Sequence, residues 1–525
     1  MKKIFTLIAL AASTVAAMAT DYTDRLSVVI NGAATAPAAV NTISVVEEGA
    51  GYTLTLKNFE LTLGGVPMSV GTIVVPNVSG TAADGSTVLK SAQAINIVPG
   101  DATPTGGFWM GPSLGDVPVD IVAEMTADHL YAIITINLPG MNIEVTFGEM
   151  YQVVNSDFEF FHTAATSDGS VTSDEPNSWH SFMSSTGMLA AVVSSVPHTF
   201  IGNEARPGSA GMNSVLIKSG LALGSIVANG TLTTGQLQAG GFSATSTKNN
   251  AFLDITNTEK DANGDPFYTL LNGRPDSVTV WVKFKQDTPV EEHPYATITA
   301  AVTNGSYYQE PIDKDYNDII VARAENNKIE SLGNTWQRLS IPFDYDTYTA
   351  GATPKALFVT ISTNADPGEG TGADSLYVDD FELVYNYSAT AISVQGTAIE
   401  GFDKDKTEYN VTINGDANQL KAEDFVVTTD AHGATVATEI ALPDNGKNEA
   451  AVDVTVTSND LKHSKTYFIN VTGKTTDNIS TVGNDADNAV KAVYNLNGQR
   501  VENAVKGGLY ITKQADGKTV KSIKK

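Results

Sequence analysis

Apolar and polar residues alternate with a period of two along most of this chain. In residues 277–284 and 374–385 the apolar side chains fall mainly at every second position, and residues 52–60 show the same pattern. Successive side chains of a β-strand point to opposite faces, so this period is typical of strands that bury one face. Long runs with a helical period are few. The pattern predicts an all-β protein.

Residues 1–19 have the pattern of a cleavable signal peptide. Lys2 and Lys3 form a basic head, residues 4–17 are an apolar run, and a small-x-small cleavage position ends at Ala19. The run is too short to cross a membrane, and no other stretch reaches the roughly 18 uninterrupted apolar residues that a spanning helix needs. We expect a secreted or outer-surface protein that is exported through the periplasm.

Residues 20–150 contain eight short alternating segments separated by turn residues. The predicted strands are residues 27–31, 42–47, 52–60, 70–75, 95–98, 119–125, 131–137 and 143–147. Eight strands at this spacing predict a meander or barrel that closes its own edges. The segment resembles the calycin-like domains at the front of secreted Bacteroidetes proteins. Such a barrel either holds a small apolar ligand or is filled by its own side chains, and both alternatives stay open.

Residues 151–386 form the longest predicted domain, a single β-sandwich. Its expected strands are residues 210–217, 277–284, 296–302, 334–343, 356–362 and 374–385, after an opening strand at 153–160. The opening and closing strands are both acidic. We expect them to lie side by side as the first and last strands of the sandwich.

Three short segments of this domain carry a family resemblance. They are Asn155-x-x-Phe158-Glu159, the run 335–339 (TWQRL) and the run 377–380 (YVDD). In this order they resemble the putative carbohydrate-metabolism domain of gut Bacteroidetes, which is similar to jelly-roll carbohydrate-binding modules. The resemblance implies a jelly-roll sandwich that binds a glycan and shares a structural calcium between its terminal strands.

A calcium site is expected at Asp157, Glu159 and Asp380. Carboxylate oxygens on adjacent strands are the hard ligands that calcium takes. The alternative is that these acids only face solvent on an acidic protein.

A sugar platform is expected from aromatic residues in polar loops. Indole and phenol rings stack on the apolar faces of sugars while nearby polar groups fix their orientation. The candidates are Trp179, His180, Tyr307, Tyr308 and Tyr316. For Trp179 a second interpretation, a hydrophobic plug beneath its loop, stays open. Trp281 and Trp336 lie within alternating strands and are expected in the core.

Catalytic motifs are missing from the sequence. It contains no G-x-S-x-G, H-E-x-x-H, P-loop or dinucleotide fingerprint, and its seven histidines show no metal-ligand spacing. A glycosidase needs only two opposed carboxylates, and an acidic chain always offers such a pair. The sequence therefore leaves enzymatic activity uncertain and favours a binding protein.

Residues 387–474 form a third expected unit, a small sandwich. Gly401-Phe402 followed by Tyr409 and Val411 resembles the hallmark of cadherin-like (Ig-like) β-sandwich repeats. Spacing or adhesion is the role that this resemblance implies. The polar residues 475–489 are predicted to be a flexible linker.

Residues 490–525 reverse the charge balance of the chain. From Arg500 onward there are seven basic and two acidic residues. With Tyr494, Gly498 and the later Gly508-Leu509-Tyr510, this end closely resembles the C-terminal sorting domain of the type IX secretion system. That resemblance implies the type IX machinery as a partner.

Composition narrows the remaining possibilities. The net charge of −27 over 525 residues makes nucleic acid an improbable partner, and the absence of cysteine excludes disulfides and thiolate metal sites. We therefore predict a secreted glycan-binding protein. The alternatives are a structural or adhesion protein without a sugar site and, further behind, a glycan-cleaving enzyme.

Overall fold

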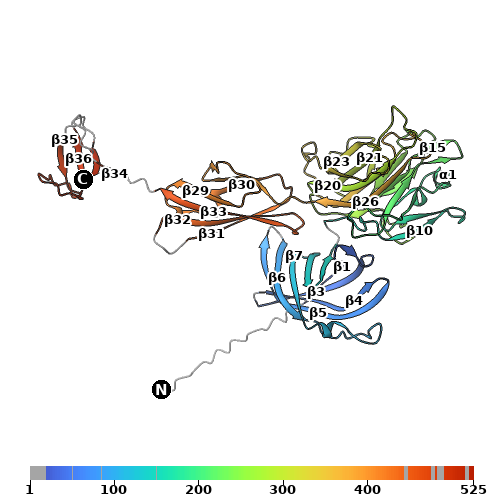
Figure 1. Ribbon diagram of the computed structural model, residues 1–525, viewed down its shortest axis with the longest axis horizontal. Coiled ribbons are helices and arrows are strands. Elements are labelled where there is room, and N and C mark those ends of the chain that lie inside the picture. Colours follow the sequence, from blue (N-terminus) through green and yellow to red (C-terminus); the bar gives the residue numbers. More distant parts are fainter. Residues whose placement is uncertain are drawn as a thin grey trace, which may run out of the picture. The chain divides into compact units, whose positions relative to one another are not determined.

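The computed structural model describes residues 19–49, 51–83, 86–148, 151–442, 447–474, 479–481, 490–514 and 519–524. Residues 1–18 of the predicted signal peptide lie outside this part of the chain. Within it the protein is all-β, as predicted (Figure 1). The helical elements are α1 (Ala190–Val193) and four 3-10 turns, η1 (Gly111–Leu114), η2 (Phe182–Ser184), η3 (Ala417–Gln419) and η4 (Ala422–Asp424). No helix among the described residues is long and apolar enough to span a membrane.

The N-terminal domain is an eight-stranded barrel. Its strands are β1 (Thr20–Ile30), β3 (Ala39–Glu48), β4 (Gly51–Leu63), β5 (Val66–Ala83), β6 (Ser86–Asn96), β7 (Asp116–Met125), β8 (Leu130–Leu138) and β9 (Met141–Phe147). They pair in sequence order, and β1 also pairs with β9, which closes the sheet; the two-residue β2 (Ala33–Ala34) extends β1 on its other side. Inward-facing side chains such as Leu54, Ile121 and Phe147 form one buried cluster.

The predicted barrel strands are confirmed with one shift. The fifth was predicted at residues 95–98, whereas β6 covers Ser86–Asn96. Only Leu89 and Ile95 are buried among the described side chains of this strand. Its apolar signal is therefore too sparse to mark the whole strand in the sequence.

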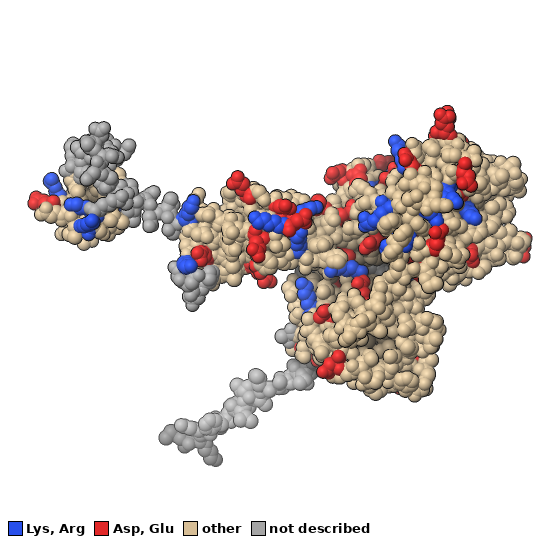
Figure 2. All heavy atoms as spheres, viewed as in Figure 1, with Lys and Arg blue, Asp and Glu red and all other residues tan. Residues whose placement is uncertain are grey.

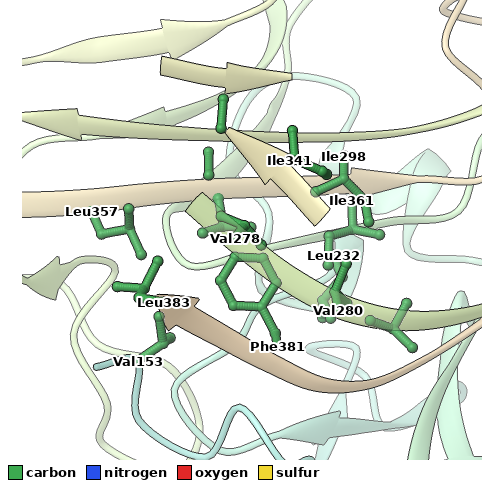
Figure 3. Close-up of a cluster of buried hydrophobic side chains, with 14 of the residues drawn as sticks. Val153, Leu232, Val278, Val280, Ile298, Ile341, Leu357, Ile361, Phe381 and Leu383 are labelled. Atoms are coloured by element: carbon green, nitrogen blue, oxygen red, sulfur yellow. The ribbon is translucent and has the colours of Figure 1, made fainter. Parts of the chain in front are cut away.

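The central domain is a sandwich of two sheets. One sheet has the order β12 (Thr199–Gly202), β13 (Ser214–Lys218), β26 (Ser375–Val384), β20 (Ser277–Lys285), β24 (Gln337–Pro342). The other has the order β16 (Thr231–Thr233), β25 (Ala356–Ser362), β21 (Ala296–Thr303), β23 (Ile320–Ile329), with β19 (Thr269–Leu270) also paired to β25. Apolar side chains from both sheets meet between them, as Val280, Phe381 and Ile361 show in Figure 3.

A third, smaller sheet covers the outer face of the second one. It consists of β17 (Gln236–Ala239), β18 (Asn249–Leu253) and β22 (Tyr308–Glu310). A second core lies beneath it, where Leu237 and Leu253 pack with Phe358 of β25. Two hairpins complete the domain, β10 (Phe161–Ala165) with β11 (Thr172–Pro176), and β14 (Gly220–Ala222) with β15 (Ile226–Ala228).

The opening segment of the central domain is not a strand, which corrects the prediction for residues 153–160. Asn155 and Phe158 have φ values of 51° and 53°, in the left-handed region, so the chain turns there. The opening segment nevertheless lies beside the closing strand, as predicted. Gln152 exchanges two hydrogen bonds with the backbone of Leu383, and the Phe381 N–H donates to the Ser156 carbonyl at 2.9 Å. The segment therefore lies along β26 without forming a ladder.

The third predicted unit forms two sheets. One contains β28 (Thr397–Ala398), β27 (Ala389–Val394) and β30 (Phe425–Thr429), and the other β29 (Glu408–Asn414), β33 (Ser464–Lys474), β32 (Glu449–Thr457) and β31 (Thr435–Ala441). Tyr409 explains the G-F…Y pattern. Its buried ring stacks on Phe402, and its hydroxyl donates to the Asp403 carbonyl and accepts from the Asp403 N–H.

The C-terminal residues form a four-stranded sheet. Its order is β34 (Ile479–Thr481), β37 (Thr519–Ile523), β36 (Leu509–Gln514), β35 (Val490–Tyr494). Residues 479–481 fall in the predicted linker 475–489, yet they pair in parallel with β37. An isoleucine and a threonine make this short segment a suitable edge strand.

Candidate functional site

A pocket opens on the outer face of the sheet that contains β20 and β26. Along β20 the residues Val278, Val280 and Val282 point into the core, so the odd-numbered positions face outward. Trp281 is one of these outward residues and is only half-buried. Its cross-strand neighbour on β24 is Arg338.

A bulge in β26 brings two carboxylates to the same face. Thr279 of β20 lies opposite Glu382, but Trp281 lies opposite Asp379, so β26 carries one more residue than its partner between these pairs. Asp380 occupies the bulge with φ 44°. Bulges of this kind re-aim side chains and are frequent beside functional sites.

The pocket has a volume of about 460 Å³ and a mixed lining. Trp281 supplies an aromatic surface, Arg206 and Arg338 supply guanidinium groups, and Asp157 and Asp380 supply carboxylates. This volume lies within the range of about 300–1,000 Å³ that is usual for small-molecule sites. Such sites typically have a few convergent polar groups beside apolar or aromatic side chains.

Arg206 connects the parts of the pocket. Its Nε donates to Asp380 Oδ2 at 2.5 Å, and its backbone N–H donates to Asp379 Oδ2 at 2.6 Å. Its guanidinium carbon lies 5.4 Å from the centre of the Trp281 ring, within the range of a cation–π contact. The indole is therefore held in place by a fixed positive charge.

Burial and crowding of acids change two pKa values here. Burial, together with the charges of Glu159 and Asp380, raises the pKa of Asp157 to about 6. Burial, together with the same two charges, raises the pKa of Asp379 to about 7, although the hydrogen bond from the Arg206 backbone works in the other direction. Raised carboxyl pKa values in a cleft indicate a candidate functional site.

The residues predicted to bind calcium lie in this neighbourhood. Asp157 is close enough to Glu159 and Asp380 for both charges to act on it. Glu159, however, accepts hydrogen bonds from the backbone N–H groups of Met212 and Asn213, both at 2.8 Å, and Asp380 pairs with Arg206. Calcium binding at Asp157, Glu159 and Asp380 stays a prediction.

Trp179 and His180 lie in the interior, which corrects their predicted role in sugar stacking. Both have no exposed surface. The Trp179 indole packs against Phe158 and Phe381 at centroid distances of 5.1 and 5.7 Å, and its Nε1 donates to the Val154 carbonyl. A ring without exposed surface cannot stack on a sugar, so the plug alternative fits Trp179.

Two of the three predicted tyrosines are also buried. Tyr308 has no exposed surface, Tyr316 is 4% exposed, and both belong to the core beneath the small third sheet. Their stacking role is corrected for the same reason. Tyr307 is 37% exposed and stacks on Phe252, so it alone of the predicted platform is accessible.

Trp281 and Trp336 were expected in the core, and this expectation is wrong because both are only half-buried. Trp336 is half-buried and faces Lys283, whose Nζ lies 5.2 Å from the Trp336 ring and 3.9 Å from the Tyr377 ring. The signal that could have identified Trp281 is its phase in β20. It alternates with the valines and therefore belongs to the outer face.

Charged side chains of both signs are mixed over the visible surface rather than segregated, despite the net charge of −27 (Figure 2). The mixed lining of the pocket follows the same pattern.

Comparison with known proteins identifies the fold of the N-terminal domain. Residues 18–149 match the family model of the calycin-like beta-barrel domain, so the N-terminal domain is a calycin-like barrel. Among solved structures, a chain described under "Structural basis for the promiscuous specificity of the carbohydrate-binding modules from the beta-sandwich super family" is 9% identical. That match covers 69% of this chain and 98% of the other, with a TM-score of 0.20. No curated protein matches the chain.

Proposed function

We propose that the central domain binds a glycan in the pocket beside Trp281. The observation that carries this proposal is an outward-facing indole in a recess of about 460 Å³ that is also lined by two arginines, a lysine and three carboxylates. An indole covers the apolar face of a sugar ring, while charged groups accept from and donate to its hydroxyls. The bulge at Asp380 and the contact of Arg206 with Trp281 keep these groups in place before a ligand arrives.

Replacing Trp281 by alanine is expected to weaken glycan binding at least roughly tenfold, because a central aromatic contact dominates such sites. A glycan array with the full chain identifies the ligand, and titration calorimetry measures the loss. Trp336→Ala is the matched control, since Trp336 is half-buried near the same sheet but does not line the pocket. It should leave affinity unchanged.

Two results would contradict the proposal. Equal loss of affinity in both tryptophan variants would show a general disturbance of the sheet. No binding of any arrayed glycan by well-folded protein would favour a structural or adhesion role. Release of shortened glycan during the titration would instead identify the pocket as an enzyme site.

We also propose that calcium stabilises the acidic cluster at Asp157, Glu159 and Asp380. Burial is the main cause of the raised pKa of Asp157, and a cation would offset the repulsion from Glu159 and Asp380 that adds to it. Calcium is expected to raise the melting midpoint of chelator-treated protein, because an ion that binds only the folded state stabilises it. Glu159→Gln should abolish the rise. Identical melting curves with and without calcium would mean that the hydrogen bonds to Glu159 and the Arg206 pair already satisfy these acids.

Export to the cell surface is proposed from the two ends of the sequence. The resemblance of residues 490–525 to a sorting domain, and the signal-peptide pattern of residues 1–19, both point to this route. Deleting residues 490–525 is expected to trap the protein in the periplasm of a host that has the type IX system. Protease accessibility on intact cells measures the effect, and surface display that persists after the deletion would contradict it.

A further inference from the structure

A second group of polar side chains meets in the interior of the central domain. His162 on β10 lies directly opposite Glu175 on β11, and Asp261 reaches them from the loop before β19. His180, bridged to Thr233, reaches the same Asp261. The His162 side chain is 10% exposed, and the other three have no exposed surface.

Three of the atoms that face one another in this group have no hydrogen-bond partner. His162 Nε2 lies 3.7 Å from Glu175 Oε2 and 3.6 Å from Asp261 Oδ2, and His180 Nε2 lies 3.4 Å from Asp261 Oδ2. These separations exceed the usual 2.7–3.2 Å of such bonds. His162 Nε2, His180 Nε2 and Asp261 Oδ2 are buried and unpartnered. Orphaned buried polar atoms are costly, so their convergence indicates a missing occupant.

A hydrogen bond at Nδ1 orients the His162 ring. Nδ1 lies 3.2 Å from Asn177 Oδ1, and because that oxygen can only accept, Nδ1 is the donor. In a neutral ring Nε2 then carries a lone pair that points toward two carboxylate oxygens. The lone pair and the carboxylates repel one another unless a proton or a metal ion lies between them. Donation by the other ring nitrogen is the way in which metal-bound histidines are oriented.

Both carboxylates are held in position by hydrogen bonds from neighbouring hydroxyl and backbone N–H groups. Glu175 Oε1 accepts from the N–H and hydroxyl of Ser181, and Oε2 accepts from the Ser184 hydroxyl. Asp261 Oδ1 accepts from two backbone N–H groups of its own turn, at 2.7 and 2.9 Å. Burial raises the pKa of Asp261, but the facing His180 and the backbone hydrogen bond from Asp265 outweigh it and leave the pKa lowered.

The three histidine–carboxylate distances fit a small metal ion better than a water molecule. Ligand bonds of about 2.1 Å at a tetrahedral zinc place neighbouring donor atoms about 3.4 Å apart. Donor pairs at 3.4 to 3.7 Å would subtend about 110–125° at such an ion. A water at about 2.8 Å from the same atoms would have its hydrogen bonds compressed to roughly 80°. Histidine nitrogens also select zinc-like ions over calcium, which prefers oxygen.

We propose that His162, Glu175 and Asp261 bind a zinc-like divalent transition-metal ion, with His180 the nearest candidate for the fourth position. The donor atoms of the first three lie within 4.8 Å of one another. The site's donor atoms are buried, which is typical of structural rather than catalytic zinc. It would clamp the β10–β11 hairpin to a loop about 100 residues later, so binding would add directly to folding stability.

The test uses the full chain, stripped with a chelator and dialysed. Titration with zinc should give one bound equivalent by elemental analysis, and cobalt should give the visible absorption of a tetrahedral N/O site. Zinc at about a hundred times its dissociation constant should raise the melting midpoint of the domain by about 5–10 °C. Folded wild-type protein that binds neither metal would overturn the proposal, whatever the variants do.

Variants assign the ion to this site. His162→Ala and Asp261→Ala should each lose the bound equivalent and the cobalt spectrum. His293→Ala is the matched control, because His293 also faces two carboxylates, Asp366 and Glu369, but at the surface. It should bind as the wild type does. Glu159→Gln should keep the zinc response while it loses any calcium response, which separates the two metal predictions. Unchanged zinc stoichiometry in both His162→Ala and Asp261→Ala would place the metal elsewhere and refute the proposal.

Discussion

Replacing Trp179 by alanine is expected to destabilise the central domain by about 3–5 kcal/mol, the usual cost of removing a fully buried large aromatic side chain. The ring has no exposed surface and packs between Phe158 and Phe381. Its loss would leave a cavity and an unpaired carbonyl on Val154, which now accepts from the indole at 3.1 Å.

Thermal melting measures this effect as a fall of roughly 6–20 °C in the midpoint for a domain of this size. Trp179→Phe retains part of the packing and should recover part of the loss. Trp281→Ala supplies a comparison at a half-buried tryptophan and should cost less stability while it removes binding. A Trp179→Ala protein that melts like the wild type but binds glycan weakly would return Trp179 to the predicted platform.

Glu310→Ala is expected to be the second most damaging change, at about 3 kcal/mol, because it leaves buried polar groups without their partner. Glu310 Oε1 accepts from the Tyr308 hydroxyl at 2.5 Å and from Arg323 Nε at 2.8 Å. Tyr308 has no exposed surface, and burial beside Glu310 raises its pKa well above the ordinary value. Arg323 keeps a two-pronged contact with Glu325 and so loses only part of its pairing.

A double-mutant cycle separates the two contributions. Tyr308→Phe removes the hydroxyl with little change in packing and should cost about 1 kcal/mol. In the Tyr308→Phe background, Glu310→Ala should cost less than it does alone, because no buried hydroxyl is left unpaired. Strictly additive free energies of unfolding by denaturant would show that the Tyr308–Glu310 hydrogen bond contributes nothing to stability.

The apolar patterns of β20, β21, β25 and β26 were sufficient to predict these strands, because such patterns are local information; this holds even for β21 and β25, which are buried on both faces. The same holds for the barrel. Its strands follow one another along the sheet, so neighbours in sequence are neighbours in space. The prediction of a strand at residues 153–160 was wrong because the left-handed conformations of Asn155 and Phe158 depend on contacts with residues distant in the sequence. Asn155, for example, donates to the Asn177 carbonyl, 22 residues away.

The sequence by itself thus determined the all-β class, most strand positions and the calycin-like barrel. The tertiary structure decided which aromatic rings are accessible. Trp179 lies in a polar loop but is covered by the sandwich core, and Trp281 lies in a strand but on its outer face. It also decided that His162 and Asp261 meet. The physical reason is that burial and ligand geometry arise when sheets pack and distant loops close over them, and a local pattern along the chain carries no record of those contacts.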